Sequence, residues 1–292
     1  LIKNGYDSYS MLNGRVYALP LDPSVQIFLY RTDLFHDAKL CRAYYERFHE
    51  NLVVPTTYQQ YLHAAEFFTR SCNPDSPTEY GTTMTCGSAS VAASDFLPFY
   101  LSRIDRFGTT PETLRLDCPE MQAAMRQYHA LEKFSCKQNW WGDSIQKFAD
   151  GKTAMTVIYS NYAAELINSG NSVVVGRVGA AILPGCKPLL GGGIVGISKY
   201  SQKAEACKQF FRWYYSADVA SLLVRLGGTS PIVDAYEDFQ NYSIFPWMNT
   251  SKKSFGLGQR GVINQAPERF SIPKYEFAVG TAIRNVVQDL MT

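Results

Sequence analysis

The sequence lacks any apolar run that approaches the roughly 20 residues needed to span a bilayer. Its most apolar segments are interrupted by glycine, serine or charged residues. It also lacks a marked charge of either sign, because 28 lysines and arginines nearly balance 26 aspartates and glutamates for a net charge of +2. No basic run alternates with aromatic residues, so the sequence predicts neither a membrane span nor a nucleic-acid partner.

Catalytic signatures are missing as well. There is no GxSxG elbow, no HExxH pair and no P-loop, and the carboxylates are scattered rather than paired as a glycosidase would need them. The four histidines lie on predicted helices or loops with no nucleophile motif nearby, and we expect them to be packing or surface residues: His36, His49, His63 and His129. We therefore expect no catalysis and no cofactor.

Two GxGxxG matches begin at Gly191 and Gly256. A dinucleotide fingerprint must follow a strand and open a helix. The first match instead runs into a predicted strand at 194–198, and the second lies in a predicted loop. Neither match predicts a nucleotide site.

Seven cysteines are present, but no CxxC pair or Cys/His cluster has zinc-ligand spacing, so we expect no metal. An odd count leaves at least one thiol unpaired, and free cysteine packs as a small hydrophobic residue. Cys72 and Cys86 flank the turn at 73–77, and they are the best candidates for a disulfide if one forms.

What is present is the pattern of an ordinary globular chain. Hydrophobic residues make up 46% and charged residues 18%, and 292 residues suffice for one large domain or two smaller ones. Alternating strands and helices predict an α/β fold. We expect strands at 26–30, 80–85, 153–159, 173–178, 180–183 and 194–198, and helices at 57–68, 117–134, 144–150, 161–168, 201–215, 217–226 and 274–291. The segment 238–269 is polar and aperiodic and is predicted to be loop.

The most informative segment is 144–160, SIQKFADGKTAMTVIYS. Ile145 and Phe148 lie on one helical face, Asp143 or Ser144 can cap the first turn, and Gly151 can end the helix in a left-handed conformation. A β-prone strand follows. Open α/β sheets bind ligands at the carboxyl ends of their strands, so the aromatic and polar residues from 159 to 162 are predicted to lie at a binding edge.

Six short pieces of the chain, taken in order, resemble the family 1 extracellular solute-binding proteins, the receptors of ABC sugar importers. The pieces are residues 14–20 (GRVYALP), 29–35 (LYRTDLF), 55–61 (PTTYQQY), 148–155 (FADGKTAM), 191–198 (GGGIVGIS) and 272–276 (IPKYE). Each is weak alone, but their order covers nearly the whole chain.

The resemblance implies the two-lobe, type II periplasmic-binding-protein architecture with a three-strand hinge. Lobe 1 would comprise 1–31 and 192–238, and lobe 2 would comprise 32–191 and 239–292. Family members open with a βαβαβ segment before the strand that begins near Tyr17 here. We therefore expect lobe 1 to be incomplete in a fragment that lacks its targeting segment, and a cleft to lie between the lobes.

A sugar site needs flat aromatic platforms for apolar C–H faces and short polar groups for hydroxyls. Trp140 and Trp141 precede the motif helix, and Tyr159 and Tyr162 follow its strand. Family positions add further candidates, and the full set of expected ligand-binding residues is Asp22, Ser24, Asp95, Phe96, Trp140, Trp141, Tyr159, Asn161, Tyr162, Gly192 and Gly193. Many sugar-binding members have an aromatic residue after the paired glycines, whereas this chain has Ile194, which leaves the type of saccharide open.

The resemblance thus implies an extracytoplasmic, monomeric receptor, in the periplasm or lipid-anchored at the cell surface. It would capture a carbohydrate, with an oligosaccharide favoured, by hinge closure and deliver it to a membrane ABC permease. Three alternatives remain at this point. They are a ligand-sensing domain of a regulator or receptor, a receptor for another solute such as ferric ion or a polyamine, and a carbohydrate-active enzyme.

Overall fold

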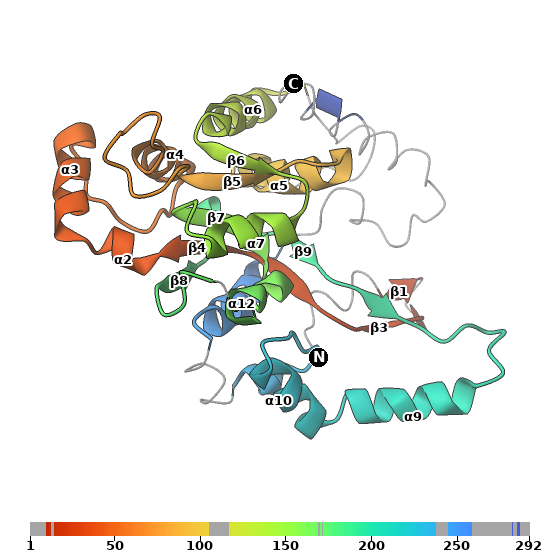
Figure 1. The fold of residues 1–292 in the computed structure, drawn as a ribbon. Helices are drawn as coiled ribbons and strands as arrows, with labels where there is room; N and C mark the ends of the chain where they lie inside the picture. Colours follow the sequence, from red (N-terminus) through yellow and green to blue (C-terminus); the bar gives the residue numbers. More distant parts are fainter. Residues whose placement is uncertain are drawn as a thin grey trace.

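A computed structural model describes residues 10–12, 15–104, 117–168, 170, 172–237, 245–258, 282 and 285–286. Figure 1 shows a mixed α/β molecule built around one long strand, β4 (Ser24–Arg31), which joins an upper group of helices to a lower one. Its antiparallel partners are β7 (Met155–Tyr159), β8 (Val178–Ala181) and β9 (Leu190–Gly191). The observed class agrees with the predicted α/β fold.

Strand β4 is buried on both faces because its residues alternate between two hydrophobic cores. Phe28 belongs to the core under the upper helices, whereas Val25, Ile27 and Leu29 belong to the core on the opposite face. Apolar residues on both faces are typical of a strand covered on two sides. The polar Gln26 is also fully buried, and its side chain is bonded to backbone atoms on both sides.

The upper core is closed by five helices. These are α2 (Thr32–Phe35), α3 (Ala38–Phe48), α4 (Tyr58–Phe67), α5 (Ala89–Leu101) and α6 (Pro119–Glu132). Thr57 caps α4 in a complete capping box, in which Thr57 Oγ1 accepts from Gln60 N and the Gln60 side chain accepts from Thr57 N. This confirms the predicted helix start.

Three strands of the upper region run parallel, so their carboxyl ends meet at one edge. Strand β5 (Thr82–Thr85) pairs in parallel with β6 (Ser135–Gln138), and a parallel bridge joins Tyr80 to Thr153 just before β7. Helix α7 (Trp141–Ala149) connects β6 to β7. The edge therefore gathers the residues that follow β5, β6 and β7.

The opposite core is formed by α7, by α10 (Ala217–Arg225) and by α12 (Trp247–Leu257). After β7 the chain forms η1 (Ser160–Tyr162), α8 (Glu165–Asn168) and, beyond β8, η2 (Pro184–Cys186), and η3 (Val233–Tyr236) precedes α12. Helix α10, in the range predicted for lobe 1, thus shares a core with α12, in the range predicted for lobe 2.

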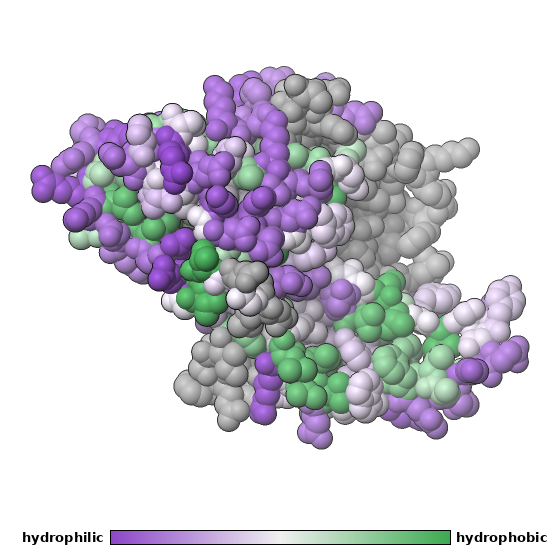
Figure 2. All heavy atoms as spheres, in the orientation of Figure 1, coloured by the Kyte–Doolittle hydropathy of each residue, from purple (hydrophilic) through white to green (hydrophobic). Residues whose placement is uncertain are grey.

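Helix α9 (Ala204–Tyr214) extends from the lower body (Figure 1). None of its side chains is buried. Its Trp213 is 58% exposed, and Phe210 is also exposed. Two short ladders accompany it: β1 (Met11–Leu12) with β2 (Arg15–Val16), and β3 (Leu19–Pro20) with β10 (Ile194–Val195). Figure 2 shows apolar residues gathered over this lower region.

Several predicted elements are wrong in type or extent. Residues 173–176 form turns, so the strand starts only at Val178, and the predicted helix 161–168 is split between η1 and α8. The predicted loop 238–269 contains α12, whose Trp247, Met248 and Phe255 are buried. Spacings of one, seven and eight residues put these three on one helical face, a signal hidden by the polar residues between them. The predicted helix 274–291 lies mostly outside the described residues.

Three further expectations are also corrected: the cap of the helix at 144–150, the start of the helix at 117–134, and the candidate disulfide. Helix α7 has Trp140 at its N-cap without a side-chain bond, so neither Asp143 nor Ser144 caps it. Helix α6 starts after Cys118, because Pro119 takes the first helical position. Cys72 and Cys86 are free thiols rather than a disulfide. The backbone N–H of Cys72 donates to Thr69 O and that of Cys86 donates to Gln138 O, so the two residues are fixed to different segments.

Within the described part of the chain, no helix has both the length and the apolarity to cross a bilayer.

Candidate functional site

Four aromatic side chains converge at the carboxyl edge of the parallel strands, and we call Trp140, Trp141, Tyr159 and Tyr162 the aromatic platform. Trp141 contacts the Trp140 and Tyr159 rings edge-on, with centroids 4.7 and 4.9 Å away. Trp140 Nε1 donates to Tyr162 Oη at 2.7 Å. Trp140 is 46% exposed whereas Trp141 is buried, so the platform is accessible to solvent on the side of Trp140.

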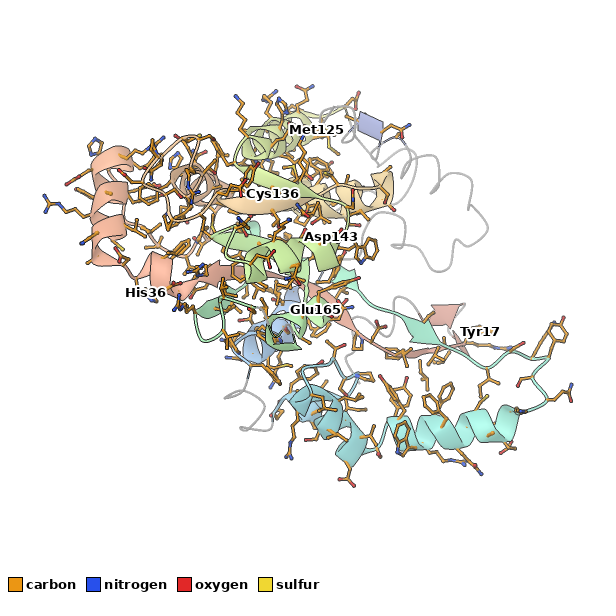
Figure 3. The ribbon with its side chains drawn as sticks, viewed as in Figure 1. Tyr17, His36, Met125, Cys136, Asp143 and Glu165 are labelled. Atoms are coloured by element: carbon orange, nitrogen blue, oxygen red, sulfur yellow. The ribbon has the colours of Figure 1, made fainter. Side chains whose placement is uncertain are left out.

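Local sequence explains how these rings come together. The parallel register of β5 and β6 delivers the chain to Trp140, and α7 returns it to β7, which ends at Tyr159. Figure 3 shows Cys136 on β6, Asp143 on α7 and Glu165 on α8, the elements that surround this edge. Asp143 lies in the first turn of α7, where a carboxylate is favourable to the helix dipole.

The three consecutive glycines at 191–193, which we call the glycine run, lie beside Asp22. Gly193 N donates to Asp22 Oδ1 at 2.5 Å, and Leu21 N donates to Gly193 O at 2.8 Å. Gly192 has φ +103°, and a Cβ there would lie 2.3 Å from Asp22 O. Only glycine fits this backbone without strain. Asp22, Gly192 and Gly193 therefore form one compact unit.

The platform rests directly on the glycine run. A Cβ on Gly191 would lie 2.6 Å from Tyr159 Cε1 and 2.9 Å from Ser24 Oγ. Ser160 Oγ also accepts a hydrogen bond from Val25 N at 3.3 Å, which pins the end of β7 to β4. Ser24 is only 2% exposed, so the structure places it beneath the tyrosine rather than on an open surface.

Electrostatics link the platform to Asp22. Burial raises the pKa of Tyr162, the hydrogen bond from Trp140 opposes that shift, and the Asp22 carboxylate adds to it. Burial and the same carboxylate also raise the pKa of Tyr214. Asp22 therefore lies within electrostatic reach of a tyrosine from α9 and of one from the platform.

Two buried polar atoms at the platform have no hydrogen-bond partner among the described residues, Trp141 Nε1 and Asn161 Oδ1. An unsatisfied buried donor or acceptor costs about 1–3 kcal/mol. Such groups are uncommon, and each calls for a structural or functional explanation. Their position beside Tyr159 and Tyr162 puts a donor and an acceptor next to apolar ring faces.

The structure does not bring Asp95 and Phe96 to this cluster. Phe96 is fully buried and packs edge-on against Tyr128 with centroids 5.5 Å apart. Asp95 Oδ2 accepts from Tyr128 Oη at 2.9 Å and from Thr85 N at 3.4 Å. Burial raises the pKa of Asp95 to about 7, which the two hydrogen bonds only partly offset. The Phe96 ring is directed into the upper core, whereas Asp95 is half-buried and bonds to α6 and β5 rather than to the platform.

Sequence reasoning missed three side chains that connect distant segments of the chain by hydrogen bonds. Gln26 Nε2 donates to Ser94 O at 3.0 Å, and Gln26 Oε1 accepts from Leu189 N at 2.9 Å. The hydroxyl groups of Tyr214 and Tyr215 donate to the carbonyls of Leu21 and Pro20, respectively. The available signals were a lone polar residue inside an apolar strand and a tyrosine pair at a helix end.

The described residues hold no group of three or more His, Cys, Asp or Glu side chains that could bind a metal. What the edge provides is aromatic faces, one carboxylate, hydroxyls and backbone amides. Such a set can hold an uncharged ligand that combines apolar C–H faces with hydroxyl groups.

Comparisons with known proteins identify the family and the fold. A family model described as bacterial extracellular solute-binding protein matches residues 2–247. No curated protein sequence matches the chain. The chain therefore belongs, by its family match, to the bacterial extracellular solute-binding proteins.

Solved structures share the fold at low identity. An ABC transporter solute-binding protein from Agrobacterium radiobacter, in complex with ribitol, is 21% identical with a TM-score of 0.75, over 99% of this chain and 70% of that one. The GacH receptor of Streptomyces glaucescens, solved unliganded and in complex with acarbose, is 18% identical with a TM-score of 0.73, over 98% of this chain and 69% of that one. Maltose-bound MalE3 of T. maritima is 20% identical with a TM-score of 0.69, over 98% and 75%. The fold is thus the two-lobe α/β fold of solute-binding proteins.

Proposed function

We propose that this chain captures a carbohydrate or polyol at the aromatic platform and delivers it to an ABC permease. The observation that carries the proposal is the convergence of Trp140, Trp141, Tyr159 and Tyr162 beside Asp22 and the glycine run. Structural neighbours with the same fold have been solved with bound ribitol, D-mannitol and maltose.

Each group has a chemical task in this proposal. The exposed face of Trp140 stacks on C–H faces of the ligand, while Tyr162 Oη and Asp22 bind hydroxyl groups. Gly192 and Gly193 allow a close backbone approach. Trp141 and Tyr159 are buried and fix the positions of the other two rings by packing. Asn161 supplies an amide oxygen as a hydrogen-bond acceptor for the ligand, and Ser24 packs under Tyr159.

Binding alone suffices for such a receptor, so we infer a monomer that carries out no catalysis and needs no cofactor. Lobe 1 (1–31 and 192–238) and lobe 2 (32–191 and 239–292) would close around the solute, because the closed form makes more contacts with it. Extracytoplasmic placement fits a family described as extracellular. Attachment by a lipid or release into a periplasm are both consistent with this mechanism.

The test is a ligand titration with ribitol, D-mannitol and maltose, followed by calorimetry and by a thermal shift. We expect at least one of them to bind, and Trp140→Ala and Tyr162→Ala to weaken binding about 10–100-fold, the effect of losing one good stacking or hydrogen-bonding anchor. Trp213→Ala is the matched control, because Trp213 is similarly exposed but lies on α9. It should leave the affinity unchanged.

Two results would refute the proposal. One is the absence of any shift across a broad panel of saccharides and polyols. The other is an equal loss of affinity in the Trp140 and Trp213 variants, which would show that the platform is not the binding surface.

A further inference from the structure

The backbone segment that leads to Asp22 is bound by two tyrosines from the end of helix α9. The hydroxyl group of Tyr214 donates a hydrogen bond to Leu21 O. The hydroxyl group of the next residue, Tyr215, donates to Pro20 O at 2.5 Å. These bonds join positions 193 and 195 residues apart, and Figure 1 shows β3 running alongside α9. Helix α9 thus contacts the chain immediately before the candidate ligand carboxylate.

Aromatic packing within α9 fixes the two phenol rings. Tyr214 stacks on Phe210, one turn earlier, with centroids 5.8 Å apart. Tyr215 contacts Phe211 edge-on at 6.3 Å, again across four positions. The two tyrosine rings also meet edge-on at 5.2 Å. Side chains four positions apart lie on one helix surface, so these contacts restrict the rings and keep their hydroxyl groups in place. No side chain of α9 is buried, so the tyrosines are not core residues.

The glycine run binds the same segment from its other side. Leu21 N donates to Gly193 O at 2.8 Å, and Gly193 N donates to Asp22 Oδ1 at 2.5 Å. Strand β3 also pairs with β10, directly after the glycine run. Residues 20–22 are therefore bonded both to α9 and to the glycine run. Because the peptide bond after Leu21 leads straight to Asp22, its orientation sets the direction of the Asp22 side chain.

Asp22 has one carboxylate oxygen left for a ligand. Gly193 N occupies Oδ1, and none of the residues that the structure describes donates a hydrogen bond to Oδ2. Burial is the main cause of the raised pKa values of Tyr162 in the platform and Tyr214 in α9, and the Asp22 carboxylate adds to both shifts. The carboxylate is thus within electrostatic reach of the platform and of the tyrosine pair.

From these contacts we propose that Tyr214 and Tyr215 are positioning residues for Asp22. They hold residues 20–22 against the glycine run and so keep the carboxylate beside the aromatic platform. Neither tyrosine has to contact the ligand for this role. That Asp22 binds a ligand hydroxyl rests on the proposed function, whereas the hold of the tyrosines on the segment does not.

Amide hydrogen exchange of the full chain, measured by NMR without ligand, tests the hold itself. Phenylalanine keeps each ring and its packing and removes only the hydroxyl group. We expect Tyr214→Phe and Tyr215→Phe each to speed exchange of the Leu21 and Gly193 amides about 3–10-fold, the effect of losing one hydrogen bond. The Arg31 amide, bonded at the far end of β4, is the internal control and should not change. Unchanged exchange at Gly193, or equal acceleration at Arg31, would overturn the proposal.

Calorimetry with ribitol, D-mannitol and maltose tests the consequence for binding. For a solute that binds the wild type, we expect each tyrosine variant to weaken the affinity about 3–10-fold. In an Asp22→Ala background the same substitutions should add less than about twofold, because the side chain that they position is gone. Tyr44→Phe is the matched control, since its hydroxyl group bonds to Glu50 among the upper helices. It should leave the affinity unchanged. Equal losses with and without the Asp22 side chain would overturn the proposal.

The two measurements separate failure of the positioning role from failure of the proposed function. If none of the three solutes binds the wild type, the proposed function fails, and the exchange rates alone decide the positioning role. If a solute binds but the tyrosine variants leave both its affinity and the exchange of Gly193 unchanged, only the positioning role is refuted. The exchange rates also decide the role where Asp22→Ala binds too weakly to measure.

Discussion

Substitution of Gly192 by alanine tests the glycine run most directly. The residue has φ +103°, and the added Cβ would lie 2.3 Å from Asp22 O and 2.8 Å from Pro23 Cα. A positive φ costs an alanine about 1–2 kcal/mol. The contacts are with backbone atoms, which cannot rotate away as a flexible side chain could, so the segment at Asp22 must move.

Alanine substitutions at two other glycines separate the cost of a positive φ from the cost of the close backbone contacts. Gly176 has φ +73°, but a Cβ there would meet no atom within 4 Å, so Gly176→Ala measures the backbone cost alone. Gly256, near the end of α12, has neither a positive φ nor a close neighbour. There alanine should be neutral or stabilising by a few tenths of a kcal/mol.

We expect losses in free energy of unfolding of about 3 kcal/mol or more for Gly192→Ala and about 1 kcal/mol for Gly176→Ala. Urea denaturation followed by circular dichroism would show the difference as a midpoint shift of roughly 1 M. Equal losses in the two variants would refute the argument, because the close approach of Gly192 to Asp22 would then have no energetic effect.

Two further predictions concern the elements that support the site. Thr57→Ala should cost about 1 kcal/mol by removing the capping box of α4, measured by thermal unfolding; a change below the experimental error would mean that the cap contributes nothing. Phe28→Ala should cost about 3–5 kcal/mol, because Phe28 is fully buried in β4 and packs edge-on against Tyr61 at 5.2 Å. Urea denaturation measures it, and a loss below 1 kcal/mol would show that the neighbouring core collapses into the space.

Local signals predicted much of the fold. The 144–160 segment forms the expected helix, left-handed glycine at Gly151 (φ +71°) and strand. The Thr57 cap is equally local, because its partner is three residues away. The prediction of a strand at 173–178 was wrong, because a run of valines favours β structure only weakly and tertiary context can override it. Residues 173–176 form turns, and the strand begins at Val178.

The candidate site was predicted only in part. Residues 159–162 could be singled out because they follow a predicted strand, whose end was expected at a binding edge. Trp140 and Trp141 were singled out only because they precede the motif helix, since the strand before them, β6, was not predicted. Asp95 and Phe96 could not be oriented, because their helix α5 is buried on several sides and periodicity alone does not reveal which side faces a cleft. The sequence also did not reveal that Gln26 fastens Ser94 and Leu189, two segments distant along the chain.

The amino-acid sequence by itself determined the α/β class, many of the helices and strands, the glycine run at 191–193 and the aromatic residues that flank the motif helix and strand. These depend on residue type and on neighbours within a few positions. The tertiary structure alone decided that Trp140 donates to Tyr162, that Asp22 accepts from Gly193, and that Asp95 faces inward toward Tyr128. The reason is that each of these contacts joins residues 22 to 171 positions apart, and only strand register and core packing fix such distances.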